Sequence, residues 1–104
     1  MNRKILSYLG FAAKSANAIS GTNTCESELK KRKVYLVLIS EDASDNTKIN
    51  FKEIADSKKI PWRICGNSEE ISKAIGKTGR NVIAVKEKNL AEAIISEIDL
   101  LDRY

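Results

Sequence analysis

The chain has 104 residues, two cysteines and no histidine, and its formal net charge at pH 7 is +4. This length is typical of one domain, so we expect a single domain over residues 1–104. Without histidine, no Ser–His or Cys–His catalytic pair can form. Two cysteines with no histidine also exclude a zinc site of the usual kind. We therefore expect no catalytic activity, no metal, no cofactor and no small-molecule substrate.

The cysteines and the N-terminus give two further expectations. Cys25 and Cys65 are predicted to be buried thiols, because free cysteine behaves as a small hydrophobic residue; a disulfide between them is the alternative. Near the N-terminus, the apolar stretch 5–11 is too short and too interrupted for a signal peptide or a membrane span. We therefore expect a cytoplasmic protein that does not bind a membrane.

The positive charge lies in the first half of the chain. Residues 1–52 carry nine Lys or Arg against five Asp or Glu, whereas residues 53–104 carry nine of each. Most of the excess comes from the run Lys30–Lys33, which reads Lys-Lys-Arg-Lys. A basic patch of this kind attracts phosphate backbones or anionic surfaces. The alternative is a solvated helix end, where lysines are common.

The elements at the start of the chain are a helix, a brief strand and a second helix. Apolar residues at helical spacing predict an amphipathic helix over residues 3–15, followed by a short strand at 17–20. Asn23 with Glu26 three residues later resembles a capping arrangement. We expect this pair to start the second helix, which ends near Lys31–Lys33.

The middle of the chain predicts a buried strand, a helix and a second strand. Residues 34–39 form a continuous β-branched and apolar run, typical of a strand buried on both faces. Ser44 is the predicted N-cap of a third helix that ends near Ser57–Lys58. Residues 60–65 alternate and are typical of a strand, and Pro61 near their start indicates either a strand at the edge of the sheet or the entry into a strand.

The last third of the chain continues the alternation. Asn67 marks the start of another helix, and Gly76 is a natural residue just past its end. A loop at 77–81 precedes an apolar strand at 82–85, and Asn89 begins the last helix. Helices alternating with short apolar strands predict a three-layer α/β/α sandwich around a small mixed sheet.

The turn that begins at Gly21 is the strongest candidate site among the local motifs. Gly21 permits a sharp bend, after which Thr22, Asn23 and Thr24 offer amides and short polar side chains at a helix N-terminus. Such an end is suited to bind phosphate, and an Asn side chain can both donate to and accept from a purine edge. The alternative is that Asn23 is only a helix cap.

Two other polar segments are weaker candidates. The loop Lys77–Asn81 is basic and polar, and its alternative reading is a solvated connector. Glu41 and Asp42 follow a buried strand, where α/β proteins place sites, and could hold Mg²⁺ as in receiver domains. The preferred reading is that Asp42 and Ser44 cap the next helix, because a third acidic residue after the N-terminal strand is missing.

The motifs taken together carry a resemblance that covers nearly the whole chain. They are Leu9–Lys14, Ser20–Gly21, Leu36–Thr47 (LVLISEDASDNT), Ile60–Pro61, Ile75–Lys77 and Val82–Val85. In this order they resemble the kink-turn-binding family of large-subunit ribosomal proteins of archaea and eukaryotes, and more closely its small bacterial members. The resemblance implies an α/β/α sandwich and a structured RNA partner with a kink-turn or a similar element, and makes the ribosome a candidate partner.

The resemblance also implies which residues contact the RNA. Gly21 and Asn23 match the family's Gly-x-Asn-Glu-x-x-Lys segment, Glu41–Ala43 match a second contact loop, and Gly76–Val82 match a third that packs against a flipped-out nucleotide. Phosphate contacts are expected from Lys30, Lys31 and Arg32. The predicted RNA-binding residues are Gly21, Thr22, Asn23, Thr24, Ser27, Lys30, Lys31, Glu41, Asp42, Lys77, Arg80, Asn81 and Val82.

Two of these positions depart from the family pattern. Thr24 stands where the family often has Glu, and Ser27 stands where it often has Lys. The missing Lys removes a donor suited to guanine O6, and a good base contact is worth roughly 1–3 kcal/mol. These departures leave an alternative function: a protein-interaction or assembly module with weak or lost RNA readout.

Overall fold

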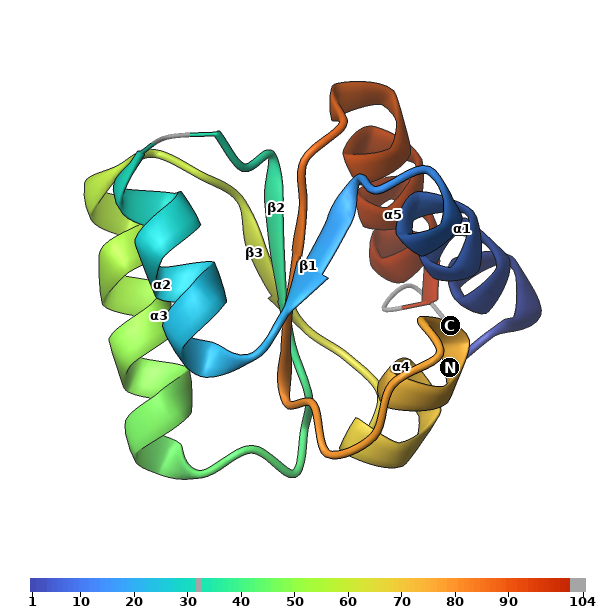
Figure 1. Ribbon diagram of the computed structural model, residues 1–104, viewed down its shortest axis with the longest axis horizontal. Coiled ribbons are helices and arrows are strands. Elements are labelled where there is room, and N and C mark those ends of the chain that lie inside the picture. The colour runs from blue at the N-terminus through green and yellow to red at the C-terminus, as the bar shows by residue number, and fades with distance from the viewer. Residues whose placement is uncertain (32, 102–104) are drawn as a thin grey trace.

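The fold is a sheet covered by helices on both faces. The computed structural model describes residues 1–31 and 33–101, with α2 and α3 on one face of the sheet and α1, α4 and α5 on the other (Figure 1). The helices are α1 (Arg3–Lys14), α2 (Thr22–Lys30), α3 (Asp45–Ser57), α4 (Ser68–Ala74) and α5 (Lys88–Leu101). This arrangement confirms the predicted three-layer α/β/α sandwich.

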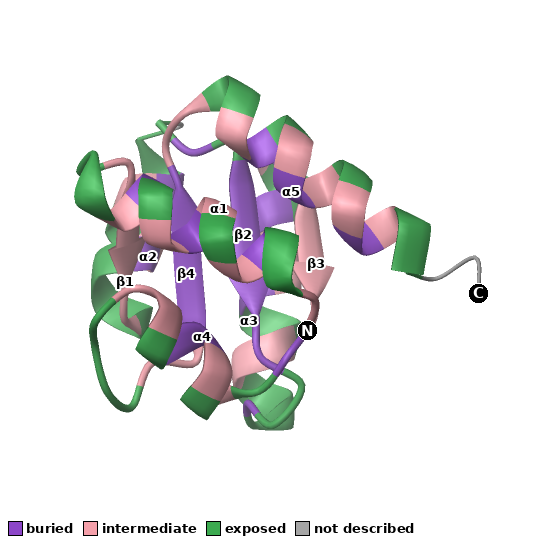
Figure 2. Ribbon diagram, turned by 90° about the vertical axis from the view of Figure 1, so that its right-hand side faces the viewer, coloured by how far each residue is buried: buried purple, intermediate pink, exposed green. Residues whose placement is uncertain are grey.

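The central sheet is mixed, as predicted. Its strands are β1 (Ala18–Ser20), β2 (Leu36–Ile39), β3 (Trp62–Ile64) and β4 (Val82–Val85). They lie in the order β1-β4-β2-β3, with β4 antiparallel to both neighbours and β2 parallel to β3. Every residue of β2 and β4 is buried, whereas β1 and β3 are half-buried edge strands (Figure 2). Pro61 immediately precedes one edge strand, which confirms the expectation from its missing N–H.

The core consists of two hydrophobic clusters, one on each face of the sheet. Successive side chains of a strand point to opposite faces, so Val37 packs with the α2 and α3 side chains while Leu38 packs with those of α1 and α5. Cys25 is buried in the first cluster, whereas Cys65 is half-buried against the second. The two thiols therefore lie on opposite faces of the sheet, and the predicted full burial holds only for Cys25.

The helix starts test the predicted caps. Ser44 accepts a hydrogen bond from the Thr47 N–H and caps α3, and Asn67 caps α4 in the same way, both as predicted. The capping arrangement predicted at Asn23 is wrong, because β1 runs almost directly into α2 and Gly21 takes the N-cap position without any side-chain hydrogen bond. Asn23 is then the second residue of the helix.

Chain connections meet at two opposite ends of the sheet. We call the lower end in Figure 1 the turn end; there β1, β2 and β3 finish and β4 begins. Its segments are residues 20–24, 40–47, 66–70 and 76–81. We call the upper end the lysine end, with residues 14–17, 30–31, 33–35, 58–61 and 86–89. None of the helices in the described part of the chain has the length and hydropathy that crossing a bilayer requires.

Candidate nucleic-acid interface

The turn at Gly21 is held by backbone hydrogen bonds to the opposite strand. Gly21 has φ 97° and ψ 147°, a conformation that is essentially restricted to glycine. Its N–H donates to the carbonyl of Val82 at 3.1 Å, and its own carbonyl accepts from the Cys25 N–H at 3.0 Å. The chain therefore leaves β1 and enters α2 within one residue, and the glycine is required by geometry.

The first turn of α2 presents polar groups to solvent. Thr22, Asn23 and Thr24 are exposed, and the Asn23 side chain makes no hydrogen bond with any residue that the structure describes. The first N–H groups of a helix have no intrahelical acceptor, and Gly21 provides no side chain to cap them. Both the Asn23 amide and the backbone donors beside it are thus available to a ligand.

The Ser40–Asp42 segment packs beside the start of β4. The Ser40 N–H donates to the Asn81 carbonyl at 2.9 Å, and the buried Ser40 hydroxyl lies 3.3 Å from the side-chain oxygen of Asn81. The Glu41 N–H donates to the Gly66 carbonyl at 2.7 Å. These bonds place Glu41, Asp42 and Asn81 at the same end of the sheet as Gly21, which brings two of the predicted contact loops together.

Asp42 has a structural partner that differs from the predicted one. Its carboxylate accepts from both the N–H and the hydroxyl of Ser68, each at 2.9 Å, and so fastens the start of α4 rather than capping α3. Hydrogen bonds from the hydroxyl of Ser40 and then from Ser68 lower the pKa of Asp42. Both oxygens that the receiver-domain alternative would offer to Mg²⁺ are engaged by Ser68.

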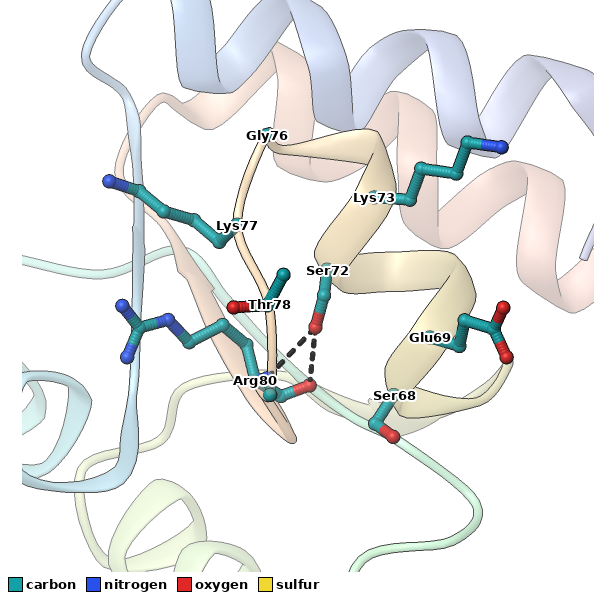
Figure 3. Close-up of a pocket in the computed structure, with 9 residues that line it drawn as sticks. Ser68, Glu69, Ser72, Lys73, Gly76, Lys77, Thr78 and Arg80 are labelled. Carbon is teal, nitrogen blue, oxygen red and sulfur yellow. Dashed lines mark hydrogen bonds between the residues drawn. The ribbon is translucent and has the colours of Figure 1, made fainter.

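The third predicted loop borders a cavity of about 740 Å³ between α4 and residues 76–80 (Figure 3). The Ser72 hydroxyl accepts from the Arg80 N–H at 2.8 Å and donates to the Arg80 carbonyl at 3.1 Å, which fixes the loop against the helix. Lys77 and Arg80 extend to one side of the loop, away from Lys73 and Glu69 on α4. A cationic pair therefore borders the loop on the side that faces β1.

Arg80 links this loop to the Gly21 turn. A Cβ atom on Gly21 would lie 3.6 Å from Nη1 of Arg80, so the guanidinium sits beside the start of α2. The Nε donor of Arg80 is buried and has no hydrogen-bond partner among the described residues. Arg80 thus adds a cation next to the exposed backbone donors of α2, an arrangement that favours anions.

Not all of the predicted residues join this site. Val82 is fully buried in the core, so only its backbone reaches the turn. Ser27 is exposed one turn along α2, and Lys30 and Lys31 lie about 13 Å from Gly21 at the other end of this nine-residue helix. They pair with Glu26 and Glu28 at 3.7 and 3.9 Å, respectively. Arg32 lies outside the described residues.

The structure adds two residues that the sequence analysis missed. A groove of about 370 Å³ separates the first turns of α2 and α3, and the amides of Asn46 and Asn50 line it together with that of Asn23. All three side chains are exposed and make no hydrogen bond with a described residue. Their spacing of four residues on α3 puts Asn46 and Asn50 on one helical face, a signal that the sequence contained.

The fold and this site together define a class of small α/β/α protein in which a glycine turn, a helix start and two loops meet at one end of a mixed sheet. Comparison with known proteins narrows the class. Residues 3–95 match the model of the ribosomal protein L7Ae/L30e/S12e/Gadd45 family. The chain belongs to this family, which confirms the resemblance predicted from its motifs.

Individual relatives support the same assignment. The chain is 31% identical over 91 residues to the RNA-binding protein YlxQ of Bacillus subtilis (strain 168), covering 88% of this chain and 91% of the relative. It is 26% identical over 90 residues to the RNA-binding protein YlxQ of Enterococcus faecium, covering 86% of each. These relatives are matched along most of their length.

Solved structures are similar as well. A protein of unknown function from Bacillus halodurans C superposes with a TM-score of 0.91 at 33% identity, covering 94% of this chain and 99% of that one. The 15.5kD RNA binding protein of Giardia lamblia gives a TM-score of 0.78 at 19% identity, covering 97% and 92% of the two chains. At that lower identity, the likeness concerns the fold alone.

Proposed function

We propose that this protein binds RNA and recognises a kink-turn or a related structured element through the turn end. It acts in the cytoplasm as part of the ribosome or another ribonucleoprotein, and it needs no cofactor and catalyses no reaction. Family membership and the names of the two YlxQ relatives support RNA as the ligand. The observation that carries the proposal is the exposed Asn23 amide, which has no hydrogen-bond partner among the described residues, at a helix start without a side-chain cap beside Arg80.

Each group at the turn end has a role in this proposal. The Asn23 amide donates to and accepts from a purine edge. Gly21 has no side chain, which lets the RNA approach the backbone closely. The free N–H groups of α2 and the guanidinium of Arg80 bind phosphate oxygens. Glu41 and Asn81 border the same surface from the neighbouring loops, and Val82 acts through its carbonyl, which holds Gly21 in place.

The two departures from the family pattern set the expected strength of binding. Thr24 accepts a hydrogen bond without the charge of a carboxylate, and charge-assisted bonds are roughly twice as strong as neutral ones. Ser27 is too short to bring a cation to a guanine edge. We therefore expect weaker binding than in relatives with Glu and Lys at these positions, by about 1–3 kcal/mol for each lost base contact.

A titration against two RNAs tests the proposal. Binding to a minimal, blunt-ended kink-turn RNA is compared with binding to a straight duplex of equal length, at several salt concentrations. We expect tighter binding to the kink-turn at every salt concentration. Equal binding to both RNAs would leave only electrostatic attraction and would refute recognition of the kink.

Replacing Asn23 by Ala then tests the location of the RNA-binding site. We expect Asn23→Ala to weaken kink-turn binding by about tenfold, as the loss of one base contact implies, and to leave the melting temperature unchanged because the side chain has no partner in the described fold. Asn89→Ala removes an exposed amide at the lysine end and serves as the matched control. Equal affinities of the two variants would exclude Asn23 from the site.

Thr24 and Ser27 also motivate the alternative of a protein-interaction or assembly module. In that case the protein binds the kink-turn RNA no better than the straight duplex, and an oligomer or a partner protein covers residues 20–31. Cross-linking and hydrogen exchange of the protein with and without RNA separate the two functions. Protection of residues 20–31 in the absence of RNA would favour the assembly module.

A further inference from the structure

The lysine end concentrates positive charge that the proposed site does not use. Its segments, residues 14–17, 30–31 with 33–35, 58–61 and 86–89, come from four separate connections of the fold (Figure 1). Within the described residues of these segments there are eight lysines and one carboxylate, that of Glu87. The lysines are Lys14, Lys30, Lys31, Lys33, Lys58, Lys59, Lys86 and Lys88.

Neighbouring carboxylates neutralise only part of this charge. Glu28 on α2 lies between Lys31 and Lys86, with nitrogen–oxygen distances of 3.9 and 3.5 Å. Lys30 pairs with Glu26 of the same helix, although its side chain is still 64% exposed. An excess of exposed cations therefore remains at this end of the sheet, and such an excess attracts a polyanion.

Helix ends explain some of these lysines and not others. Cations stabilise the C-terminal turn of a helix, which accounts for Lys14 and Lys30. Lys88, however, is the first residue of α5, where the helix dipole disfavours a cation, and the only carboxylate at this helix start within the described residues is that of Glu87, which accepts from the Leu90 N–H. Lys59 lies outside any helix at φ 57°, a left-handed conformation that asparagine or glycine adopts at lower cost. The two lysines occupy positions that local stability disfavours.

Lys59 and Lys88 border the same groove. It has a volume of about 340 Å³ and runs between α5 and the connections that precede β2 and β3. Tyr35, whose side chain is 46% exposed, lines it together with Pro61. Glu92 is a carboxylate at its border. An exposed aromatic ring in a groove that cations also line is a combination that binds single-stranded nucleic acid, because bases stack on the ring and phosphates contact the cations.

We propose that the lysine end is a second RNA-binding surface, which takes a single-stranded segment with a base stacked on Tyr35 and phosphates held by Lys59 and Lys88. The inference rests on the proposed function only in taking RNA as the ligand. The two surfaces lie at opposite ends of the sheet, so a single-stranded extension of an RNA bound at the turn end follows α2 to reach the lysines. The carboxylates of an acidic protein segment would form ion pairs with the lysines but would not stack on the exposed ring of Tyr35.

The test uses the full chain and three RNAs. They are the blunt kink-turn RNA, the same RNA with a tail of about ten uridines, within the footprint of single-strand-binding domains, and the oligouridine alone. The variant Lys59→Asn/Lys88→Gln removes two charges, and asparagine adopts the left-handed backbone conformation at residue 59 at lower cost than lysine. Arg3→Gln/Lys4→Gln removes two exposed charges from the start of α1 and is the matched control. Tyr35→Leu tests stacking.

We expect the tail to raise the affinity of the unmodified protein and of the control by about fivefold or more, as stacking of one base implies. We expect this gain to disappear in Lys59→Asn/Lys88→Gln and in Tyr35→Leu. The slope of log affinity against log salt for the tailed RNA should fall by about 0.7 for each lysine removed. A tail without effect, or a gain that survives the double variant, would overturn the inference.

The same measurements separate this inference from the proposed function. If the blunt RNA binds no better than a straight duplex while oligouridine binds through the two lysines, kink-turn recognition fails and the second surface stands. If the blunt RNA binds in an Asn23-dependent manner and the tail adds no affinity, kink-turn recognition stands and the second surface fails. Binding of polyglutamate without binding of oligouridine would assign the lysine end to an acidic protein.

Discussion

The two ends of the sheet differ in charge. The turn end carries five carboxylates against Lys77 and Arg80, whereas the described segments of the lysine end carry eight lysines against one carboxylate. The carboxylates of the turn end belong to Glu41, Asp42, Asp45, Glu69 and Glu70. Backbone hydrogen bonds between distant segments hold both ends, such as Gly21 to Val82 and Ser40 to Asn81 at the turn end and Lys86 to Asn17 at the lysine end.

This difference in charge suggests that the two ends perform two different tasks of an RNA-binding protein, recognition and non-specific attraction. Sequence and shape are read by positioned hydrogen-bonding groups, whereas phosphate contacts add affinity without reading sequence. The turn end has the exposed amide and helix N–H groups of the proposed site but an unfavourable charge for a polyanion, whereas the lysine end has an excess of cations. Specificity is therefore expected from the turn end and salt-dependent affinity from the lysine end.

The largest expected effect is that of a substitution at Gly21. A valine at φ 97° and ψ 147° is strained, which should lower the free energy of unfolding by about 1–3 kcal/mol and abolish kink-turn recognition. Chemical denaturation and RNA titration measure the two effects. Gly79→Asn is the control for the denaturation experiment, because φ 65° suits asparagine and nothing lies within 4 Å of the new Cβ. Equal stability of both variants would show that the turn is not held as described.

A smaller effect concerns the thiol beneath the turn end. Burial raises the pKa of Cys25 to about 12; nearby Glu28 adds to the rise and a backbone hydrogen bond from Ala84 opposes it. As the pH rises from 9 towards 12, the unfolded chain loses this proton and the folded chain keeps it. The free energy of unfolding should therefore fall by up to about 1.4 kcal/mol per pH unit.

Urea denaturation between pH 7 and 11 measures this dependence, with Cys65→Ala as the background so that one thiol remains. In that background, Cys25→Ala should start from a lower stability and lose the thiol's contribution to the alkaline decline. If both proteins decline in parallel, the thiol is not the group that titrates, and the region below the turn is more open to water than its packing indicates.

The smallest effect on stability is expected at the lysine end. Lys30→Gln/Lys31→Gln breaks two exposed ion pairs, which should change the free energy of unfolding by less than about 0.5 kcal/mol. The same variant should lower the salt dependence of binding to the tailed RNA and leave binding to the blunt RNA unchanged. A clear loss of affinity for the blunt RNA would mean that these lysines contribute to binding at the turn end. The two ends would then not have separate roles.

Much of the fold follows from local patterns in the sequence. Ser44 and Asn67 cap helices, and Gly76 follows one, because each of these roles depends on neighbours within a few residues. The continuous apolar run before Ser40 predicts a strand buried on both faces, and β2 is such a strand. The Gly21 turn was also identified correctly, since a sharp bend before a helix requires glycine.

Tertiary structure decided how these parts work together. Asn23 was predicted as a cap from its local spacing, but the bond from Gly21 to Val82, sixty-one residues away in the chain, moves the helix start and frees the Asn23 amide. Lys30 was predicted to contact RNA phosphates together with that turn, yet α2 carries it to the opposite end of the sheet. Strand order and register cannot be read from local periodicity, since they depend on pairing between distant residues, and they alone gather the lysines of four connections at one end.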